Sequence, residues 1–400
     1  MSDSMIDVPA IPDLAFPPHW SVPQSLDEAK QRYRGWELKL GVNSDGEVGV
    51  RLDRTPHLLV VGGTGSGKGA LVRSWLEQFR ASLWTLILAS DTGTGIAGYL
   101  SDGRSGSGLP AAGVVAHGLG TSPAGMSFVG SIVTAHRIMQ DRQRVAVDAK
   151  WADPEGWDQY APVVLVLDDI GVMRRKWGAQ LPRAEQRAIE SMITEILVLG
   201  RELRVHVVLV SQDARDVSVP ATWSSNLLVK IAAARFSEMT AAKIFPDTDR
   251  HAARLAKNVG ANGAGAFVAS ITDPNTGESR VEVLRSYLSY APGCSWSNPA
   301  LPSACAEHWP PFAAAVSDRV PRVYSRLGFK VEEPPDGETV DFDQFTVAEL
   351  QALELVTLDM RGSSGKIVAA PEMAKYDPLS GHYVCRADDA GRARVPVFEI

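Results

Sequence analysis

Short apolar runs alternate along this chain with longer stretches in which apolar residues recur at helical spacing. The short runs are rich in β-branched residues and predict strands: HLLVVG, LWTLILAS, VVLVLDD, VHVVLVSQ, LLVKIAA, GAFVAS and VEVLRSYL. The longer stretches predict helices: GALVRSWLEQFRA, SFVGSIVTAHRIMQDRQRVAV, AEQRAIESMITEILVLGREL and FSEMTAAKIF. This alternation predicts an α/β fold with a mainly parallel sheet and helices on both of its faces.

The pattern weakens toward both ends of the chain. Residues 1–37 are Pro-bearing and weakly patterned, which predicts an extended N-terminal arm. The segment WELKLGVNSDGEVGVRL predicts a β-hairpin around NSDGE that leads into the main domain, residues 38–290. Residues 291–319 are Pro-rich and predict a connector. Residues 320–400 form an extension with one helix-like stretch, TVAELQALELVTL, and no chemical motif.

Composition narrows the class of protein. The chain has 400 residues, of which 45% are hydrophobic and 22% charged, as in an ordinary globular protein. Its longest apolar runs are too short to cross a bilayer, and its acidic N-terminus lacks the features of a signal peptide. We therefore expect a cytoplasmic protein whose membrane attachment, if any, comes through a partner. The 3 cysteines do not predict a disulfide framework or, together with His308, a complete zinc site.

The segment VVGGTGSGKGALV follows a predicted strand and opens a predicted helix. Gly62, Gly67 and Lys68 have the spacing of a phosphate-binding loop. Glycines let consecutive backbone N–H groups turn toward phosphates, and the lysine reaches the β and γ phosphates. We therefore expect ATP to be bound by Gly62, Gly63, Thr64, Gly65, Ser66, Gly67, Lys68, Gly69 and Ala70.

Two adjacent acids end the strand in APVVLVLDDIG. Burial of two carboxylates without a nearby cation is costly, so this pair indicates a cation site. Asp168 is placed to hold Mg²⁺ directly or through water, and Asp169 to orient the attacking water.

Gly69 occupies the position where a phosphate-binding loop usually has Ser or Thr. The hydroxyl of such a residue would donate one oxygen to Mg²⁺. Because Mg²⁺ keeps several waters in most nucleotide sites, another water can take that place. We expect a site that hydrolyses ATP and binds Mg²⁺ somewhat more weakly. A domain that binds nucleotide without hydrolysing it is the alternative.

Several stretches, in the right order, resemble the motor domain of the FtsK/SpoIIIE family of DNA translocases. They are TPHLLVVGGTGSGKG with Pro56 and His57, IVTAHRIMQDR with Met139 and Arg142, VVLVLDDIG, and LGRELRVHVVLVSQ. The resemblance covers roughly residues 38 to 290. The chain departs from the family at Gly69 and Ala70, at Asp169 where Glu is usual, and at Asp213 where Arg-Pro is usual.

The resemblance implies a homo-oligomeric ring, commonly a hexamer, through which double-stranded DNA passes. Gln212 would sense the γ-phosphate, and a cation from the neighbouring subunit would stabilise the transition state. Arg201 and Arg235 are both candidates for that cation. The chain resembles a stand-alone motor for conjugation, mobile-element transfer or DNA partitioning, with membrane or mobilisation proteins as further partners.

The net charge of −7 excludes a protein coated in basic surface, but the stretch MRRKWGAQLPRAEQR is locally basic. On a loop that faces the pore, Arg174, Arg175 and Lys176 would contact DNA phosphates; a solvated helix start is the alternative. Two other functions stay open. One is a protein-export ATPase of the type VII secretion kind, and the other is a non-catalytic adaptor that binds nucleotide.

Overall fold

The computed structural model describes most of the predicted main domain and part of the C-terminal extension. The described ranges are 22–92, 96–100, 109–213, 219–233, 263–287, 322–332 and 340–385, with positions 8, 9, 241, 243–245, 252, 255, 259 and 320. The connector 291–319 and most of FSEMTAAKIF lie outside the described residues. Among the described residues, no helix combines the length and the apolar character that a membrane span needs.

A ten-stranded sheet organises the molecule, with the order β2-β1-β10-β9-β8-β3-β7-β6-β4-β5. The neighbouring strands from β8 to β5 in this order are parallel, and those from β2 to β8 pair antiparallel. The predicted α/β class with a mainly parallel sheet is therefore confirmed. The strands are β1 (Glu37–Asn43), β2 (Gly46–Arg51), β3 (His57–Gly62), β4 (Thr85–Ser90), β5 (Val114–Leu119), β6 (Val163–Asp168), β7 (Val205–Ser211), β8 (Val229–Ala233), β9 (Ala266–Thr272) and β10 (Ser279–Arg285).

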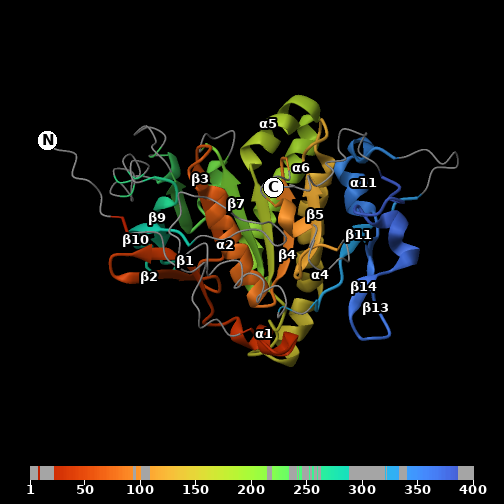
Figure 1. The fold of residues 1–400 in the computed structure, drawn as a ribbon, viewed down its shortest axis with the longest axis horizontal. Helices are drawn as coiled ribbons and strands as arrows, with labels where there is room; N and C mark the ends of the chain where they lie inside the picture. The colour runs from red at the N-terminus through yellow and green to blue at the C-terminus, as the bar shows by residue number, and fades with distance from the viewer. Residues whose placement is uncertain are drawn as a thin grey trace, which may run out of the picture.

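Helices cover both faces of the sheet (Figure 1). Side chains alternate between the faces along each strand, so Leu58 and Val60 of β3 pack in one core cluster and Leu59 and Val61 in the other. The first cluster includes α2, and the second includes α4 and α6. The helices before the C-terminal extension are α1 (Leu26–Arg32), α2 (Lys68–Ala81), α3 (Ala97–Leu100), α4 (Met126–Ala152), α5 (Ile170–Gln180), α6 (Arg183–Leu203) and α7 (Ala221–Ser224).

The N-terminal arm is not extended throughout, which corrects the prediction for residues 1–37. Residues 26–32 form α1, because Ser25 accepts a hydrogen bond from the N–H of Glu28 at the helix start. Acids in its first turn and basic residues in its last turn oppose the helix dipole. The predicted hairpin is confirmed as β1 and β2.

The C-terminal extension packs against α4 and α6, at the right of Figure 1. Phe329 and Phe342 approach α4 at Gly130 so closely that a Cβ there would lie 3.1 and 3.3 Å from their rings. The carboxylate of Asp343 accepts hydrogen bonds from the N–H groups of Ala124 and Met126, both at 2.7–2.9 Å, at the start of α4. The elements of this extension are β11 (Leu327–Phe329), η3 (Phe342–Gln344), α11 (Val347–Ala352), β12 (Leu355–Thr357), β13 (Asp359–Arg361), β14 (Ile367–Ala369) and η4 (Pro371–Tyr376).

Candidate nucleotide site

The sheet order brings the predicted site residues to one edge. Strands β3, β7 and β6 are adjacent and parallel, so the residues that follow them meet at the carboxyl edge of the sheet. The phosphate-binding loop follows β3, Gln212 follows β7, and Asp168 and Asp169 end β6. In open α/β sheets, ligands bind at this edge.

The loop after β3 has the backbone that a phosphate cradle requires. Gly65 and Gly67 have φ of 76° and 95°, a region in which L side chains are strained. Lys68 begins α2, and its Nζ donates hydrogen bonds to the carbonyl of Gly62 and, at 3.1 Å, to that of Gly63. Burial lowers the pKa of Lys68, while Asp169 and Asp168 oppose this effect. The ammonium group is thereby held against the glycine loop, on the side of the two acids.

The acid pair is held in a strained arrangement that costs stability. Burial, followed by the charges of Asp169 and Asp91, raises the pKa of Asp168 to about 6. Asp169 has φ of 57°, which is unusual for a residue other than glycine. Its Oδ2 accepts a hydrogen bond from Gln212 Nε2 at 3.1 Å, and its Oδ1 is buried without a partner among the described residues. Backbone strain and orphaned polar atoms of this kind concentrate at functional sites.

These residues fit a magnesium nucleotide. The carboxylates of Asp91, Asp168 and Asp169 lie near enough for their charges to raise the pKa values of Asp91 and Asp168, and the cations that oppose this effect are Lys68 and Lys176. A divalent cation would relieve the mutual repulsion of the three carboxylates. Within the described ranges, however, no group of three His, Cys, Asp or Glu side chains could hold a metal ion alone. Mg²⁺ in nucleotide sites needs only one or two carboxylates beside phosphates and water, and Asp168 could supply one of them.

Asp91 is a member of this region that sequence reasoning missed. It directly follows β4, whose last residue, Ser90, lies opposite Asp168 in the register of β4 and β6. Ser90 Oγ donates a hydrogen bond to Asp168 Oδ2 at 3.3 Å. Burial and the charge of Asp169 raise the pKa of Asp91. An acid directly after a strand was the available signal, but only the sheet order shows which strand lies beside it.

Gly69 leaves room for the hydroxyl that it lacks. A Cβ built at this position would have one neighbour within 4 Å outside its own helix turn, Arg73 Nη1 at 3.3 Å. The end of a flexible arginine can move by a few tenths of an ångström. Steric exclusion is therefore not the reason for glycine at this position.

The basic stretch after the acid pair is a helix, so the predicted pore loop is wrong for Arg174, Arg175 and Lys176, which all lie on α5. Arg174 pairs with Glu190 and lies 5.2 Å from the ring of Trp223. Lys176 donates to the carbonyls of Gly120 and Ser122. Arg175, 3.5 Å from Asp213, is 43% exposed, so it is the member of the three that faces solvent most.

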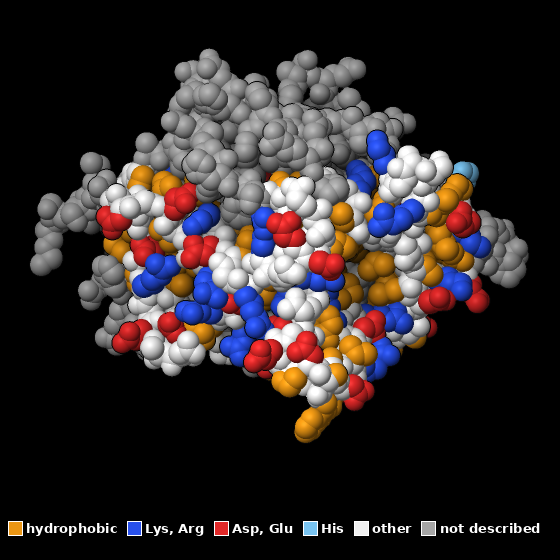
Figure 2. Space-filling model, turned by 90° about the horizontal axis from the view of Figure 1, so that it is seen from below, with side chains coloured by type: hydrophobic (Ala, Val, Ile, Leu, Met, Phe, Trp, Pro, Cys, Tyr) orange, Lys and Arg blue, Asp and Glu red, His pale blue; other side chains and the backbone are white. Residues whose placement is uncertain are grey.

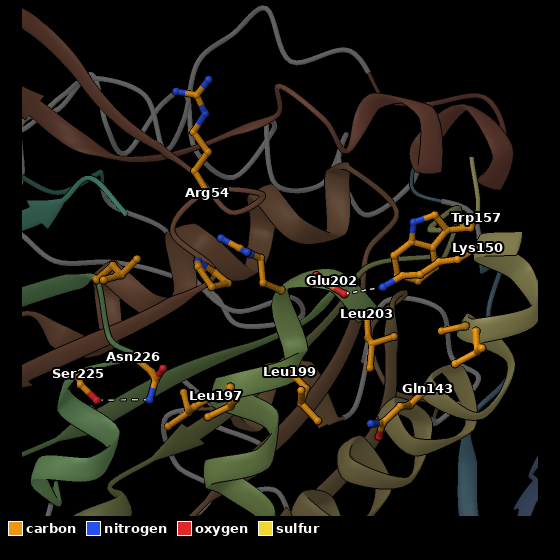
Figure 3. A pocket seen from close by; sticks show the side chains of 16 residues that line it. Arg54, Gln143, Lys150, Trp157, Leu197, Leu199, Glu202, Leu203, Ser225 and Asn226 are labelled. Atoms are coloured by element: carbon orange, nitrogen blue, oxygen red, sulfur yellow. Dashed lines mark hydrogen bonds and ion pairs between the residues drawn. The ribbon is translucent and has the colours of Figure 1, made fainter. Parts of the chain in front are cut away.

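Of the two arginines expected to act on the nucleotide of a neighbouring subunit, only Arg201 lies in the described residues. Arg235 lies outside the described residues. Arg201 is exposed near the end of α6, at the amino edge of the sheet and far from the loop of its own chain. It lines a hollow of about 440 Å³, here called the amino-edge hollow, with Arg54, Lys150, Trp157 and Leu199 (Figure 3).

Other residues of the family resemblance form a buried network at the same amino edge. Arg142 of α4 donates hydrogen bonds to the carbonyls of Ala161, Leu203 and Arg204. Burial lowers the pKa of His206 to about 3, so its ring is neutral. Its Nδ1 donates to the carbonyl of Pro56 at 3.0 Å, and its Nε2 accepts from Tyr33 Oη at 3.2 Å. These residues hold the sheet, α4 and the N-terminal arm together.

Comparisons with known proteins agree with this fold. No protein-family model and no curated protein matches the chain. The cytoplasmic domain of the type VII secretion ATPase EccC from Thermomonospora curvata is 18% identical with a TM-score of 0.52, over 77% of this chain and 33% of that one. ATPases 2 and 3 of EssC from Geobacillus thermodenitrificans are 10% identical with a TM-score of 0.51, over 80% and 54%. The conjugation coupling protein TcpA of pCW3 is 14% identical with a TM-score of 0.49, over 69% and 71%.

The chain thus spans a third of the EccC cytoplasmic domain and about half of the part of EssC that contains ATPases 2 and 3. At such low identity these likenesses concern the fold alone. Together with the glycine loop at the carboxyl end of β3, they confirm the predicted resemblance at the level of architecture. The chain has the α/β fold that the EccC and EssC ATPase domains share.

Proposed function

We propose that this protein is a Mg²⁺-dependent ATPase that assembles as a ring and moves double-stranded DNA. The observation that carries the ATPase part is the contact between Gln212 and Asp169 beside Asp168 and Lys68. A binding fold without hydrolysis would have no use for a strained acid at φ 57° with one oxygen left unpartnered.

Each residue has a role that follows from its chemistry. The backbone N–H groups of the glycine loop bind the phosphates, and Lys68 balances the charge of the terminal ones. Asp168, hydrogen-bonded by Ser90, would hold a divalent cation, which would neutralise charge that develops on the phosphates. The unpartnered Oδ1 of Asp169 would accept a hydrogen bond from the attacking water. Gln212 donates a hydrogen bond to Oδ2 and so orients the carboxylate.

In this proposal, assembly supplies a further cation from the neighbouring subunit. Arg201 lies at the opposite edge of the sheet from the loop, so it can reach a nucleotide only in a neighbouring subunit. Arg235, two positions after the end of β8 in the sequence, is the other candidate. A ring in which each subunit contacts its neighbour head to tail gives every site such a residue.

The proposal that the protein moves DNA rests on the exposed arginines of the basic stretch. Arg183 and Arg187 are exposed, lie four residues apart on α6, and have no ion pair with any described residue. The helix dipole disfavours cations in the first turns of a helix, so these arginines do not serve the stability of α6. With Arg175 they offer positive charge near the carboxyl edge, which suits contacts with phosphates.

Protein export is the second candidate, and the amino-edge face favours it. Val147, Trp151, Val198 and Leu199 are exposed on α4 and α6 beside the amino-edge hollow, with exposed fractions from 37% to 85%. Figure 2 shows this side of the molecule, where apolar and charged side chains are interspersed. Exposed apolar groups of this size are typical of protein-binding surfaces and have no role in phosphate contacts.

The ATPase rate with and without duplex DNA tests the proposal. We expect DNA to stimulate the wild-type rate, and Lys68→Ala to lower it by at least about 100-fold. Activity per subunit should rise with protein concentration, because the trans cation requires a neighbour. Wild-type turnover in Lys68→Ala would contradict the assigned site, and concentration-independent turnover by a monomer would contradict the ring.

A double variant separates DNA from protein as the cargo. Arg183→Ala with Arg187→Ala should reduce the salt dependence of DNA binding by up to about one unit per lost contact. It should also abolish stimulation by DNA and keep the basal rate. Arg361→Ala with Lys366→Ala, which removes two exposed charges from the β13–β14 hairpin, is the matched control. If wild-type protein ignores duplex DNA at low salt, the export function is favoured.

A further inference from the structure

The outer side of the phosphate-binding loop is bound by a second backbone segment. The N–H of Gly265, just before β9, donates a hydrogen bond of 3.0 Å to the carbonyl of Ser66. The two segments touch so closely that a Cβ on Gly67 would lie 2.5 Å from Gly265 N. Glycine at position 67 is what permits this contact between backbones, whereas a Cβ on Gly265 would meet Ser286 Oγ at 3.3 Å and not the loop.

This hydrogen bond fixes the direction of an N–H group in the cradle. Ser66 and Gly67 share one peptide unit, which contains the carbonyl of Ser66 and the N–H of Gly67. In a planar trans peptide these two groups point in opposite directions. When Gly265 holds the carbonyl on the outside of the loop, the N–H of Gly67 is therefore directed to the inside, where phosphates bind. Without that donor the peptide unit is free to rotate.

The donor is itself held by its neighbours. The carbonyl of Gly265 accepts a hydrogen bond of 2.9 Å from Ser286 N. Arg285 donates from Nη1 to the carbonyl of Ala264 and from Nε to that of Pro9, both at 3.0 Å. The turn before β9 is thus anchored to the end of β10 and to the N-terminal arm.

We propose that Gly265 and Arg285 are positioning residues of the nucleotide site, through which the turn before β9 sets the orientation of the Ser66–Gly67 peptide. This inference rests on the proposed nucleotide-binding function and names a part of the chain, outside the loop and the acids, on which nucleotide affinity depends. It also makes the N-terminal arm, held at Pro9 by Arg285, a contributor to that affinity.

Two glycines in the same turn provide a matched test. Gly263 and Gly265 have φ of 85° and 84°, so replacement by alanine strains the backbone equally at either position. A Cβ on Gly263 has no neighbour within 4 Å, whereas Gly265 is the donor to the loop. We expect Gly265→Ala to weaken the binding of ADP and of ATPγS, measured by calorimetry with Mg²⁺, by about tenfold or more. Gly263→Ala should stay within about twofold of wild type, with a similar unfolding midpoint in both variants.

The variant Arg285→Gln is a second test, and it leaves both glycines unchanged. It should weaken nucleotide binding by a few-fold and leave the unfolding midpoint of the nucleotide-free protein near that of Gly263→Ala. If Gly265→Ala and Arg285→Gln both bind nucleotide like Gly263→Ala, the positioning role is wrong. If wild-type protein binds neither nucleotide, it is the proposed function that fails.

Discussion

The two edges of the parallel sheet differ in whether their polar residues have hydrogen-bond partners. At the amino edge, Arg142 is partly buried and His206 is fully buried, and their polar groups bind neighbouring carbonyls and Tyr33. At the carboxyl edge, Asp168 has a raised pKa, and Asp169 combines a positive φ with an unpartnered oxygen. The first group stabilises the fold, whereas the second lowers stability and keeps charge available for a ligand. Residues of one family pattern can therefore have opposite effects on stability.

The largest effect is expected at the amino edge. Arg142→Ala should lower the free energy of unfolding by about 3 kcal/mol, because it removes the charged donor from the carbonyls of Leu203 and Ala161. Chemical denaturation measures this change. Arg144→Ala on the same helix, where the side chain is 76% exposed and paired with Asp141, should change it by less than about 0.5 kcal/mol. Equal effects of the two variants would contradict the structural role of Arg142.

At the carboxyl edge, Asp168→Asn should raise the free energy of unfolding, whereas Arg142→Ala lowers it. Because the pKa of Asp168 rises from 3.8 to about 6 on folding, protonation stabilises the folded state, and that contribution is lost as pH rises from about 4 to 6. The asparagine variant avoids this loss. Without nucleotide it should be more stable than wild type by up to about 3 kcal/mol at pH 7, and equal to it near pH 4. It should have no ATPase activity.

Denaturation of both proteins across this pH range measures the difference, and Asp148→Asn on the exposed surface of α4 is the control. If the free energy of unfolding at pH 7 is the same for wild type and Asp168→Asn, Asp168 does not destabilise the carboxyl edge as we expect.

The smallest effect is expected at Gly69, where the site lacks an oxygen that it has room for. Gly69→Ser should lower by a few-fold the Mg²⁺ concentration that half-saturates nucleotide binding, since a hydroxyl replaces one water ligand. Gly69→Ala adds the same Cβ without the oxygen and should leave the Mg²⁺ titration unchanged. Identical titrations of the two variants would show that the missing hydroxyl does not limit the site.

The sequence predicted the elements whose patterns are local. Strand β3, the glycine loop and α2 follow one another directly, so the loop was recognisable without the sheet order. Helix α5 was predicted only as the alternative to a pore loop, although Ile170, Met173 and Trp177 have helical spacing, because it starts directly after β6 at the strained Asp169. Strand β5 was missed because His117 and Gly118 interrupt its apolar run.

What depends on contacts between distant residues could not be read from the sequence. Lys176 binds the carbonyl of Gly120, and Arg174 pairs with Glu190 on the next helix, so neither charge is as available as its place in the basic stretch suggested. Asp91 joins the acids only because β4 lies beside β6. The bond from Gly265 to Ser66 joins residues that are nearly two hundred positions apart.

The docking of Phe342 and Asp343 on α4 has a consequence during synthesis. At translation rates of about 5–20 residues per second, the roughly 200 residues between Gly130 and Phe342 take on the order of 10–40 s to emerge. Until then the surface of α4 around Gly130 faces solvent, and the first N–H groups of the helix lack the carboxylate of Asp343. A nascent chain of this protein therefore exposes this incompletely capped surface of α4 for longer than it takes most single domains to fold.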